Sequence, residues 1–368
     1  MSEFIQLHVI AVYPPSNLNR DEMGRPKTAI LGGTQRLRIS SQSLKRAWRE
    51  SEFFQKALAD HMGIRTKRMG LKVLEALKSG RTLKDVLTEA DAPAANPPVS
   101  DAKAMEWANT IARVFGALKK VEKKEIPEVE QLVHYSPQEI NAIDRLISKL
   151  AHKGKDPTDK DLDLLTNEHS AVDIAMFGRF LAEKTTYITE AAVQVSHAIT
   201  VHDVMVEDDY FTAVDDLNRG GEALGAGHIG EAEFGAGVFY TYLCINRDLF
   251  RENVQGNDDL TNRAVRALTE AVAKIPPGGK QASFASRAYA SYILAERGSQ
   301  QPRSLAVAFL KPVEGKDLLG NAISALRQTR DKMDTVYGRC YDACMELNAP
   351  AGEGSLAQVL DFVSGSHA

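Results

Sequence analysis

The sequence predicts an α+β fold, in which one sheet of ferredoxin-like or RNA-recognition-motif-like strand order carries helices on one face. Three observations predict it. Dense β-type runs occur at residues 4–13 and 238–245, a helical pattern follows each run, and two more strand-like runs precede a last helical segment. Without the long insertions between the first helix and the second strand, the order is β, α, β, α, β, β, α, which fits that class of sheet.

The N-terminal elements follow from local pattern. Residues 4–13 (FIQLHVIAVY) form a dense β-type run that predicts a mostly buried strand. A loop rich in Asn, Pro and Gly comes next, and alternation at residues 36–39 predicts a short strand. We expect a helix to begin at Ser40, a suitable N-cap residue, with Leu44 and Trp48 as an i, i+4 apolar pair.

Residues 53–180 show a predominantly helical pattern. Amphipathic segments lie near residues 71–87, 102–121, 137–151 and 162–183. The loops between them are rich in Pro, Ala, Asn and Lys. This block is therefore expected to be a helical insertion outside the sheet.

The C-terminal half alternates between extended and helical patterns. Residues 193–206 predict extended structure, and residues 203–218 carry six acids and no Lys or Arg. Seven glycines between residues 220 and 237 predict a flexible connection. The remaining pattern predicts a strand at 238–245, a helix at 258–275, strands at 283–294 and 304–310, and a helix at 316–347.

Charge separates along the chain. The formal net charge of the whole chain is −4, and this overall value argues against a nucleic-acid binder. Residues 1–85, however, hold 16 Lys and Arg against 8 Asp and Glu, whereas the remaining residues hold 29 against 41. A basic N-terminal segment on an acidic body points to a polyanionic partner.

The sequence gives little support for a metal centre, a membrane protein or an enzyme. Three cysteines are too few for a disulfide framework, and Cys340 and Cys344, four apart in a helical pattern, are expected to be buried without a metal. The chain begins without a basic region before an apolar run, and no stretch approaches the roughly 20 apolar residues of a membrane span. Gly225, Gly227 and Gly230 imitate GxGxxG without its strand and helix. We expect a cytoplasmic protein without metal or cofactor.

A candidate phosphate-binding segment is RLRISSQSLKRAWR, at residues 36–49. A helix that begins at Ser40 would offer free N–H groups and its dipole to an anion, and Lys45 and Arg49 would share one helix face. The neighbouring polar and basic residues are Ser41, Ser43, Arg20, Arg25, Lys27, Arg36 and Arg38. A phosphate-binding surface and a solvated basic helix face both remain open.

Two histidines and two aromatic residues are further candidates. His197 and His202 lie five apart in an extended segment, so their rings would point to opposite faces and structural roles are expected. Phe180 ends the helical block, and Phe211 lies in the acid-rich segment that should project. Either ring could stack on an unstacked base or anchor its own segment.

Six motifs in order resemble the type I-E CRISPR-associated CasC family. They are FIQLHVI…LNRDEMGRPKTAILGGTQRLRISSQSLKRAWR, VDIAMFGRF, HAITVHD, DYFTAVDDL, FGAGVFYTYLCIN and IPPGGKQASFA. The resemblance extends to about Phe284 and is diffuse beyond it. It implies an RNA-recognition-motif-like palm at residues 1–50 and 238–347, helical fingers at 51–190, a β-hairpin thumb at 193–237 and a C-terminal segment at 348–368.

The resemblance also implies a function. CasC proteins are the repeated, non-catalytic backbone subunit of Cascade, whose copies stack head to tail along the spacer of one crRNA in a helical filament. The expected partners are crRNA, target DNA through the guide, further copies of the chain, and the CasA, CasB, CasD and CasE subunits. Sequence specificity would come from pairing between guide and target.

The family's functional positions fall on residues already singled out. The resemblance places phosphate contacts at Ser40, Gln42, Lys45 and Arg49, with Arg20 and Lys27 nearby. It places an apolar wedge beside a displaced base at Phe180 and the thumb residue at Phe211. The family often has Lys where this chain has Arg49. The alternative is a crRNA-processing endoribonuclease on a similar fold, for which His8, His197 or His202 would supply acid–base catalysis.

Overall fold

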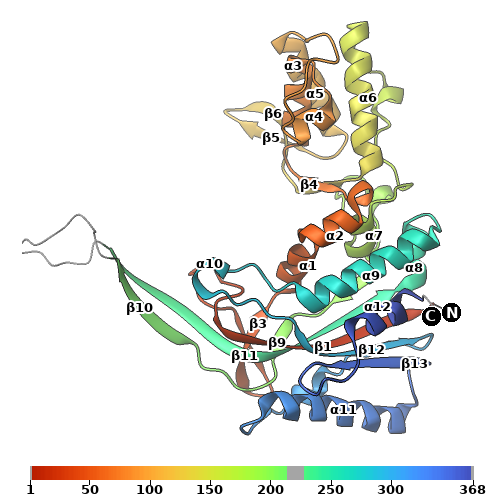
Figure 1. The fold of residues 1–368 in the computed structure, drawn as a ribbon. Helices are drawn as coiled ribbons and strands as arrows, with labels where there is room; N and C mark the ends of the chain where they lie inside the picture. The colour runs from red at the N-terminus through yellow and green to blue at the C-terminus, as the bar shows by residue number, and fades with distance from the viewer. Residues whose placement is uncertain (1, 214–227, 366–368) are drawn as a thin grey trace, which may run out of the picture. The chain divides into compact units, whose positions relative to one another are not determined.

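The computed structural model describes residues 2–213 and 228–365 (Figure 1). These residues form two compact units. The sheet unit comprises Met1–Ala57, Val193–Asp248 and Thr261–Ala368, and the helical unit comprises Leu58–Ala192 and Leu249–Leu260. The mixed α+β class predicted from the sequence is confirmed by the large antiparallel sheet and the helices that accompany it.

The sheet unit is built on a sheet whose paired strands are all antiparallel. In spatial order the main path is β13 (Ala343–Asn348), β12 (Ala290–Gly298), β1 (Phe4–Ser16), β11 (His228–Asn246), β9 (Ala198–Thr200), β3 (Thr34–Ile39) and β2 (Thr28–Leu31). Two further strands, β8 (Val193–Val195) and β10 (Glu207–Ala213), pair with β11 off this path.

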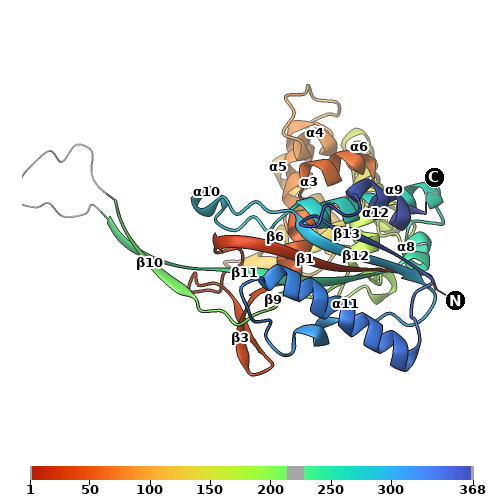
Figure 2. The same cartoon turned by 60° about the horizontal axis from the view of Figure 1, so that its bottom comes forward.

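Helices cover both faces of this sheet. On one face α11 (Leu318–Tyr337) and the 3₁₀ helix η4 (Ala306–Phe309) pack on β1, β11 and β12 through a core that includes Ile10, Tyr240 and Leu294. Figures 1 and 2 show α9 (Asp258–Lys274) and α12 (Leu356–Ser364) on the other face. The prediction of helices on a single face is therefore wrong.

Short helices complete this part of the chain. They are α1 (Ser41–Arg49), α2 (Glu52–Ala57), α8 (Arg247–Asn253), which continues into the helical unit, and α10 (Gln281–Phe284). None of the helices in the described ranges combines the length and the apolar character that crossing a bilayer requires.

The helical unit contains small hairpins as well as helices. Its helices are α3 (Met69–Ser79), α4 (Leu83–Leu87), α5 (Asp101–Arg113), α6 (Pro137–Lys153) and α7 (Val172–Phe177), with 3₁₀ turns η1 (Ala59–His61), η2 (Asp159–Leu162) and η3 (Thr185–Tyr187). Its hairpins pair β4 (Ile64–Thr66) with β7 (Val133–Tyr135) and β5 (Leu118–Val121) with β6 (Lys124–Val129). Residues 53–180 are thus less helical than predicted.

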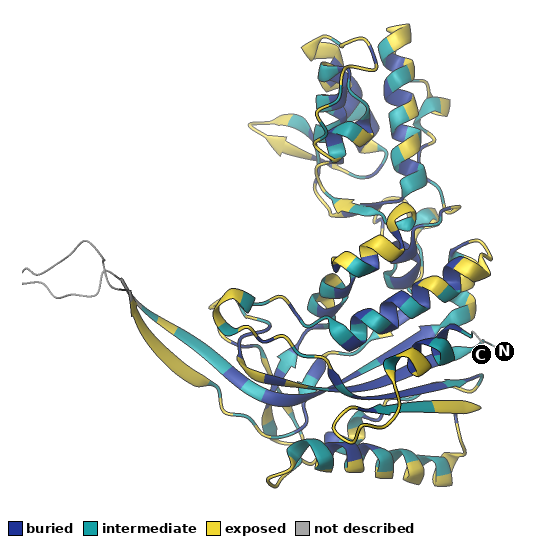
Figure 3. Ribbon diagram, in the orientation of Figure 1, coloured by how far each residue is buried: buried dark blue, intermediate teal, exposed yellow. Residues whose placement is uncertain are grey.

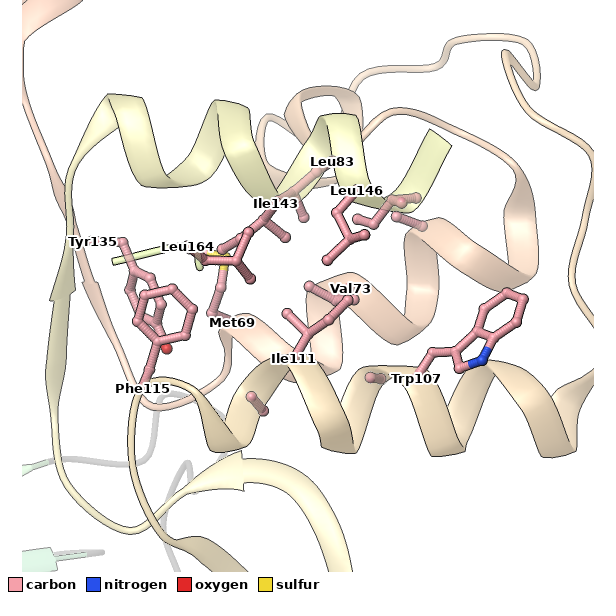
Figure 4. Close-up of a cluster of buried hydrophobic side chains, with 14 of the residues drawn as sticks. Met69, Val73, Leu83, Trp107, Ile111, Phe115, Tyr135, Ile143, Leu146 and Leu164 are labelled. Atoms are coloured by element: carbon pink, nitrogen blue, oxygen red, sulfur yellow. The ribbon is translucent and has the colours of Figure 1, made fainter. Parts of the chain in front are cut away.

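Helix α6 shows why this unit folds as it does. The Ser136 hydroxyl accepts from the Glu139 N–H, and the Glu139 carboxylate accepts from the Ser136 N–H, which forms a capping box. Gly154, with φ 63°, ends the helix. The apolar face of α6, with Ile143 and Leu146, points toward Val73 of α3 and Ile111 of α5 (Figure 4).

Several local predictions are confirmed and others are wrong. The strand at residues 4–13 and the helix that starts after Ser40 are confirmed as β1 and α1. Residues 304–310 contain a 3₁₀ turn instead of a strand, because Leu305 and Phe309 are buried in the core beneath α11. The helix predicted at residues 316–347 is α11, which ends before Gly338 because the φ of 81° at that residue stops the helix.

Because α11 ends at Tyr337, the prediction that Cys340 and Cys344 lie on a helix is also wrong. Residues 343–348 form the edge strand β13, so Cys344 lies on a strand and is exposed, whereas Cys340 precedes it and is buried. Strand β12 begins at Ala290, after α10, and not at residue 283. The predicted glycine connection is strand β11 from residue 228 onward, and its earlier part lies outside the described residues.

A buried ion pair between Arg179 and Glu139 holds the chain around Phe180 in the helical unit. The Arg179 guanidinium donates to both carboxylate oxygens of Glu139 at 2.8 Å, and both side chains are almost fully buried. Arg179 also donates to the carbonyls of Thr166 and Tyr187. The pair therefore connects the start of α6 to the chain beside Phe180.

Glu139→Ala should destabilise the helical unit by about 3–5 kcal/mol, because it leaves a buried guanidinium without its partner. Urea unfolding of the full chain measures this loss. The control is Lys149→Ala, which removes the surface pair with Asp161 and should cost about 1 kcal/mol or less. Equal losses for the two variants would contradict the account.

Candidate nucleic-acid interface

Helix α1 begins as a capped helix N-terminus on the sheet unit. Ser40 is extended (φ −67°, ψ 146°), and its Oγ accepts from the Ser43 N–H at 3.3 Å. The Ser40 N–H donates to Oδ1 of Asn19 at 2.9 Å. Ser40 is buried by these contacts, so its hydroxyl serves first to cap the helix, and the partial positive charge of the N-terminus remains available to an anion.

The rest of α1 divides into an anchoring face and a polar face. Leu44 and Trp48 are buried and fix the helix to the unit. Gln42 is exposed, and Lys45 is half-buried. Burial lowers the pKa of the Lys45 ammonium, and a phosphate beside it would offset that shift because an opposite charge favours the charged form.

Arg49 carries the last predicted cation of α1. Its Nη2 lies 3.4 Å from a carboxylate oxygen of Glu50, and its side chain is 20% exposed. Arg46 pairs with the same carboxylate at 3.0 Å from the exposed side of the helix. The Glu50 carboxylate thus offsets part of the positive charge at this end of the helix, while Lys45 lies one turn closer to the capped start.

The loop between β1 and β2 carries the other two predicted contacts, Arg20 and Lys27. The Asn19 carbonyl accepts from the Lys27 N–H at 2.8 Å, and the Asn19 side chain caps Ser40, so one residue ties the loop to the helix. Arg20 lines an open groove of about 840 Å³ with Ser43 and Lys280. The six predicted phosphate contacts therefore all lie on α1 or on the loop beside it.

Arg36 does not belong with these surface cations. It is fully buried, and it donates to Thr34 Oγ1 and to the carbonyls of Thr200 and Phe309, each at 3.0 Å. The guanidinium thereby joins β3 to β9 and to η4. Its assignment to a row of phosphate-facing cations is wrong, because this side chain satisfies buried carbonyls inside the sheet unit.

Arg38 has a partner that the sequence did not indicate. Its Nη1 lies 2.9 Å from Nδ1 of His197, and the two residues meet because β3 pairs with β9. Burial, Arg38 and Lys27 together lower the pKa of His197. His197 is therefore neutral near pH 7 and accepts from Arg38, which adds a cation on β3 next to Lys27, whose carbonyl accepts from the Arg38 N–H.

The other two histidines have structural partners. His8 is fully buried, with Nδ1 2.9 Å from the Tyr240 hydroxyl and Nε2 3.4 Å from Glu296. Both ring nitrogens of His202 form hydrogen bonds with the backbone. Nδ1 donates to the Asp203 carbonyl, and Nε2 accepts from the Val238 N–H. Within the described ranges, no three His, Cys, Asp or Glu side chains gather closely enough to hold a metal ion.

Strands β10 and β11 form a two-stranded ribbon that extends from the sheet (Figure 1). Phe211 lies on β10 directly opposite Gly230 of β11. Phe211 is 44% exposed and its neighbour Tyr210 is 61% exposed. Figure 3 shows β10 mainly as exposed. The ribbon thus presents aromatic side chains at the position predicted for Phe211, and the segment beyond Ala213 lies outside the described residues.

Phe180 belongs to the helical unit and is 69% exposed. The adjacent Arg179 is held by the buried pair with Glu139. A small cavity of about 90 Å³ lies beside Phe180, lined by residues that include Phe115, Val133 and Leu181. A fixed backbone and an exposed ring suit contact with a flat apolar partner.

Comparisons with known proteins identify solved structures of similar fold. No curated protein matches the chain. A chain of the structure described as "CRISPR RNA-guided surveillance complex, pre-nicking" is 26% identical with a TM-score of 0.82, and the match covers 99% of this chain and 100% of that one. A chain of a "CRISPR RNA-guided surveillance complex" is 22% identical with a TM-score of 0.71 and the same coverage, which shows similarity of fold alone.

The family comparison covers nearly the whole sequence. The pattern that defines the CT1975-like proteins matches residues 5–359, from the first strand of the sheet to the C-terminal helix α12. The chain therefore belongs to the CT1975-like protein family.

Proposed function

We propose that this chain is a CasC-type backbone subunit of a type I-E CRISPR surveillance complex and catalyses no reaction itself. The observation that carries the proposal is the end-to-end match, at a TM-score of 0.82, to a chain of an RNA-guided surveillance complex. Copies of the chain polymerise along the crRNA spacer in the cytoplasm and bind its phosphates. They present its bases to target DNA, which pairs with the guide in an R-loop.

The sheet unit supplies the palm and thumb of this subunit, and the helical unit supplies the fingers. The palm corresponds to the RNA-recognition-motif-like part of the sheet, and the β10–β11 ribbon corresponds to the base of the thumb. Other copies of the chain occupy the head-to-tail contacts of the filament. CasA, CasB, CasD and CasE are the proposed partners at its ends and along its length.

Phosphate binding takes place at the start of α1. The helix N-terminus, Gln42 and the cations Lys45 and Arg49 supply donors of the kind that recognise a phosphate backbone without regard to sequence. Arg20 and Lys27 extend this surface along the loop between β1 and β2. These contacts orient the guide, and the protein makes no sequence-specific contact with its bases.

Base positioning depends on the two exposed aromatic residues. Phe211 on the ribbon and Phe180 on the helical unit offer flat apolar surfaces to bases that leave the stack. Such stacking is worth about 1–3 kcal/mol per base and tolerates any base. This suits a subunit that must bind guides of every sequence.

Replacing Lys45 and Arg49 together by Ala should weaken guide binding equally for all spacer sequences. The slope of log K against log salt should fall by up to about 1.4 per copy, because each lost contact to a single strand removes about 0.7. The measurement is guide retention across a salt series. The matched control replaces Lys332 and Arg339, two exposed cations of the sheet unit; if its slope falls as much, the α1 surface has no special role.

Phe211→Ala should leave assembly nearly intact and change the exposure of guide bases at regular intervals. Chemical probing of the guide inside the purified complex measures this exposure. Thr212→Ala serves as control, because Thr212 is an exposed neighbour on the same strand whose side chain points to the opposite face. Identical probing patterns in wild type and Phe211→Ala would exclude the stacking role.

The alternative function is a crRNA-processing endoribonuclease, with His197 as the exposed histidine among its three candidates. We expect purified protein to leave repeat RNA intact in a metal-free buffer. His197→Ala and the buried-site control His8→Ala separate the two functions. Cleavage that only His197→Ala abolishes would favour the nuclease over the backbone subunit.

A further inference from the structure

The ribbon formed by β10 and β11 contains a glycine that its backbone does not require. Gly230 lies within β11, where a glycine weakens a strand because it adds conformational freedom and no packing surface. Its φ lies outside the left-handed region, so other residues could adopt the same backbone conformation. The reason for a glycine at this position must therefore lie in space and not in backbone geometry.

The space above Gly230 is filled by the ring of Phe211. A Cβ atom built on Gly230 would lie 2.4 Å from Cζ of Phe211, and 2.8 and 3.0 Å from Cε1 and Cε2. These distances are shorter than carbon–carbon contacts allow. The far edge of the ring thus rests where a side chain at position 230 would begin, and any larger residue there moves the ring.

The charges around Phe211 indicate which part of a nucleotide it contacts. The register of the ribbon places Glu207 and Asp209 on the same face as Phe211, and it places Asp208, Glu231 and Glu233 on the opposite face. Phosphates are repelled from such a surface, whereas the neutral face of a base is not. The arrangement therefore favours contact with a base and leaves the phosphates to the cations of α1.

We propose that Gly230 is a positioning residue for base stacking: by lacking a side chain, it sets the place of the Phe211 ring against which a displaced nucleobase stacks. This inference rests on the proposed function and assigns to Gly230 a role in it. Glu207 and Asp209, on the same face of the ribbon, repel the guide backbone from that surface.

The test is Gly230→Val in the complete complex that is assembled with its guide. Valine suits a strand, and the atoms that it displaces belong to the end of the Phe211 side chain, so the ribbon should still form. Dimethyl sulfate reactivity is measured at every adenine and cytosine of the spacer for wild type, Gly230→Val, Phe211→Ala and the double variant. Guide content and thermal unfolding are recorded for each complex.

Gly230→Val should reproduce the Phe211→Ala reactivity changes, at the same periodic positions and of the same size. The double variant should equal either single variant, because the ring is already displaced or absent. Ala232→Val places the same side chain on the same face, opposite Asp209, and should retain the wild-type pattern.

Three outcomes would overturn the role of Gly230. In the first, Gly230→Val keeps the wild-type pattern while Phe211→Ala changes it. In the second, the effects of the two substitutions add in the double variant. In the third, Ala232→Val acts as strongly as Gly230→Val. Either of these results would mean that the glycine only serves ribbon folding. A wild-type complex that contains no guide would instead overturn the proposed function, so the two failures are distinguishable.

Discussion

The pairing of strand β11 is the constraint on which the rest of the sheet unit depends. Its inner half lies against β1, β8 and β9, where Leu243 and Ile245 are fully buried, and its outer half pairs with β10. One continuous strand therefore joins the core to the ribbon that carries Phe211. Because the core fixes the inner half, the base of the ribbon has a defined position relative to β9, β3 and the helix α1 that follows β3.

The same unit separates two kinds of contact by charge. Donors and cations gather at the start of α1 and on the loop between β1 and β2, and Asn19 of that loop accepts from the Ser40 N–H. On the ribbon, carboxylates lie between Phe211 and the sheet, and two of them, Glu207 and Asp209, share the face of Phe211. Under the proposed function, a single-stranded guide needs both phosphate binding and base stacking, and the two surfaces would supply them without competition. This gives a physical reason for acidic residues in a protein proposed to bind RNA.

Local sequence predicted the elements that local chemistry determines. The apolar run of β1, the Ser40 cap and the anchoring pair Leu44 and Trp48 could be identified because each depends on its immediate neighbours. Arg36 could not, since its acceptors lie on β9 and η4, far away in sequence. The Arg38–His197 contact and the meeting of Phe211 with Gly230 likewise depend on strand register, which one sequence does not specify.

The most direct test of the account is to express a tagged copy of this chain with its neighbouring genes and a CRISPR array, and to sequence the RNA in the high-mass fraction. A backbone subunit predicts guides of uniform length that begin and end in repeat sequence. A low-mass fraction free of nucleic acid, with the partner proteins expressed, would contradict it.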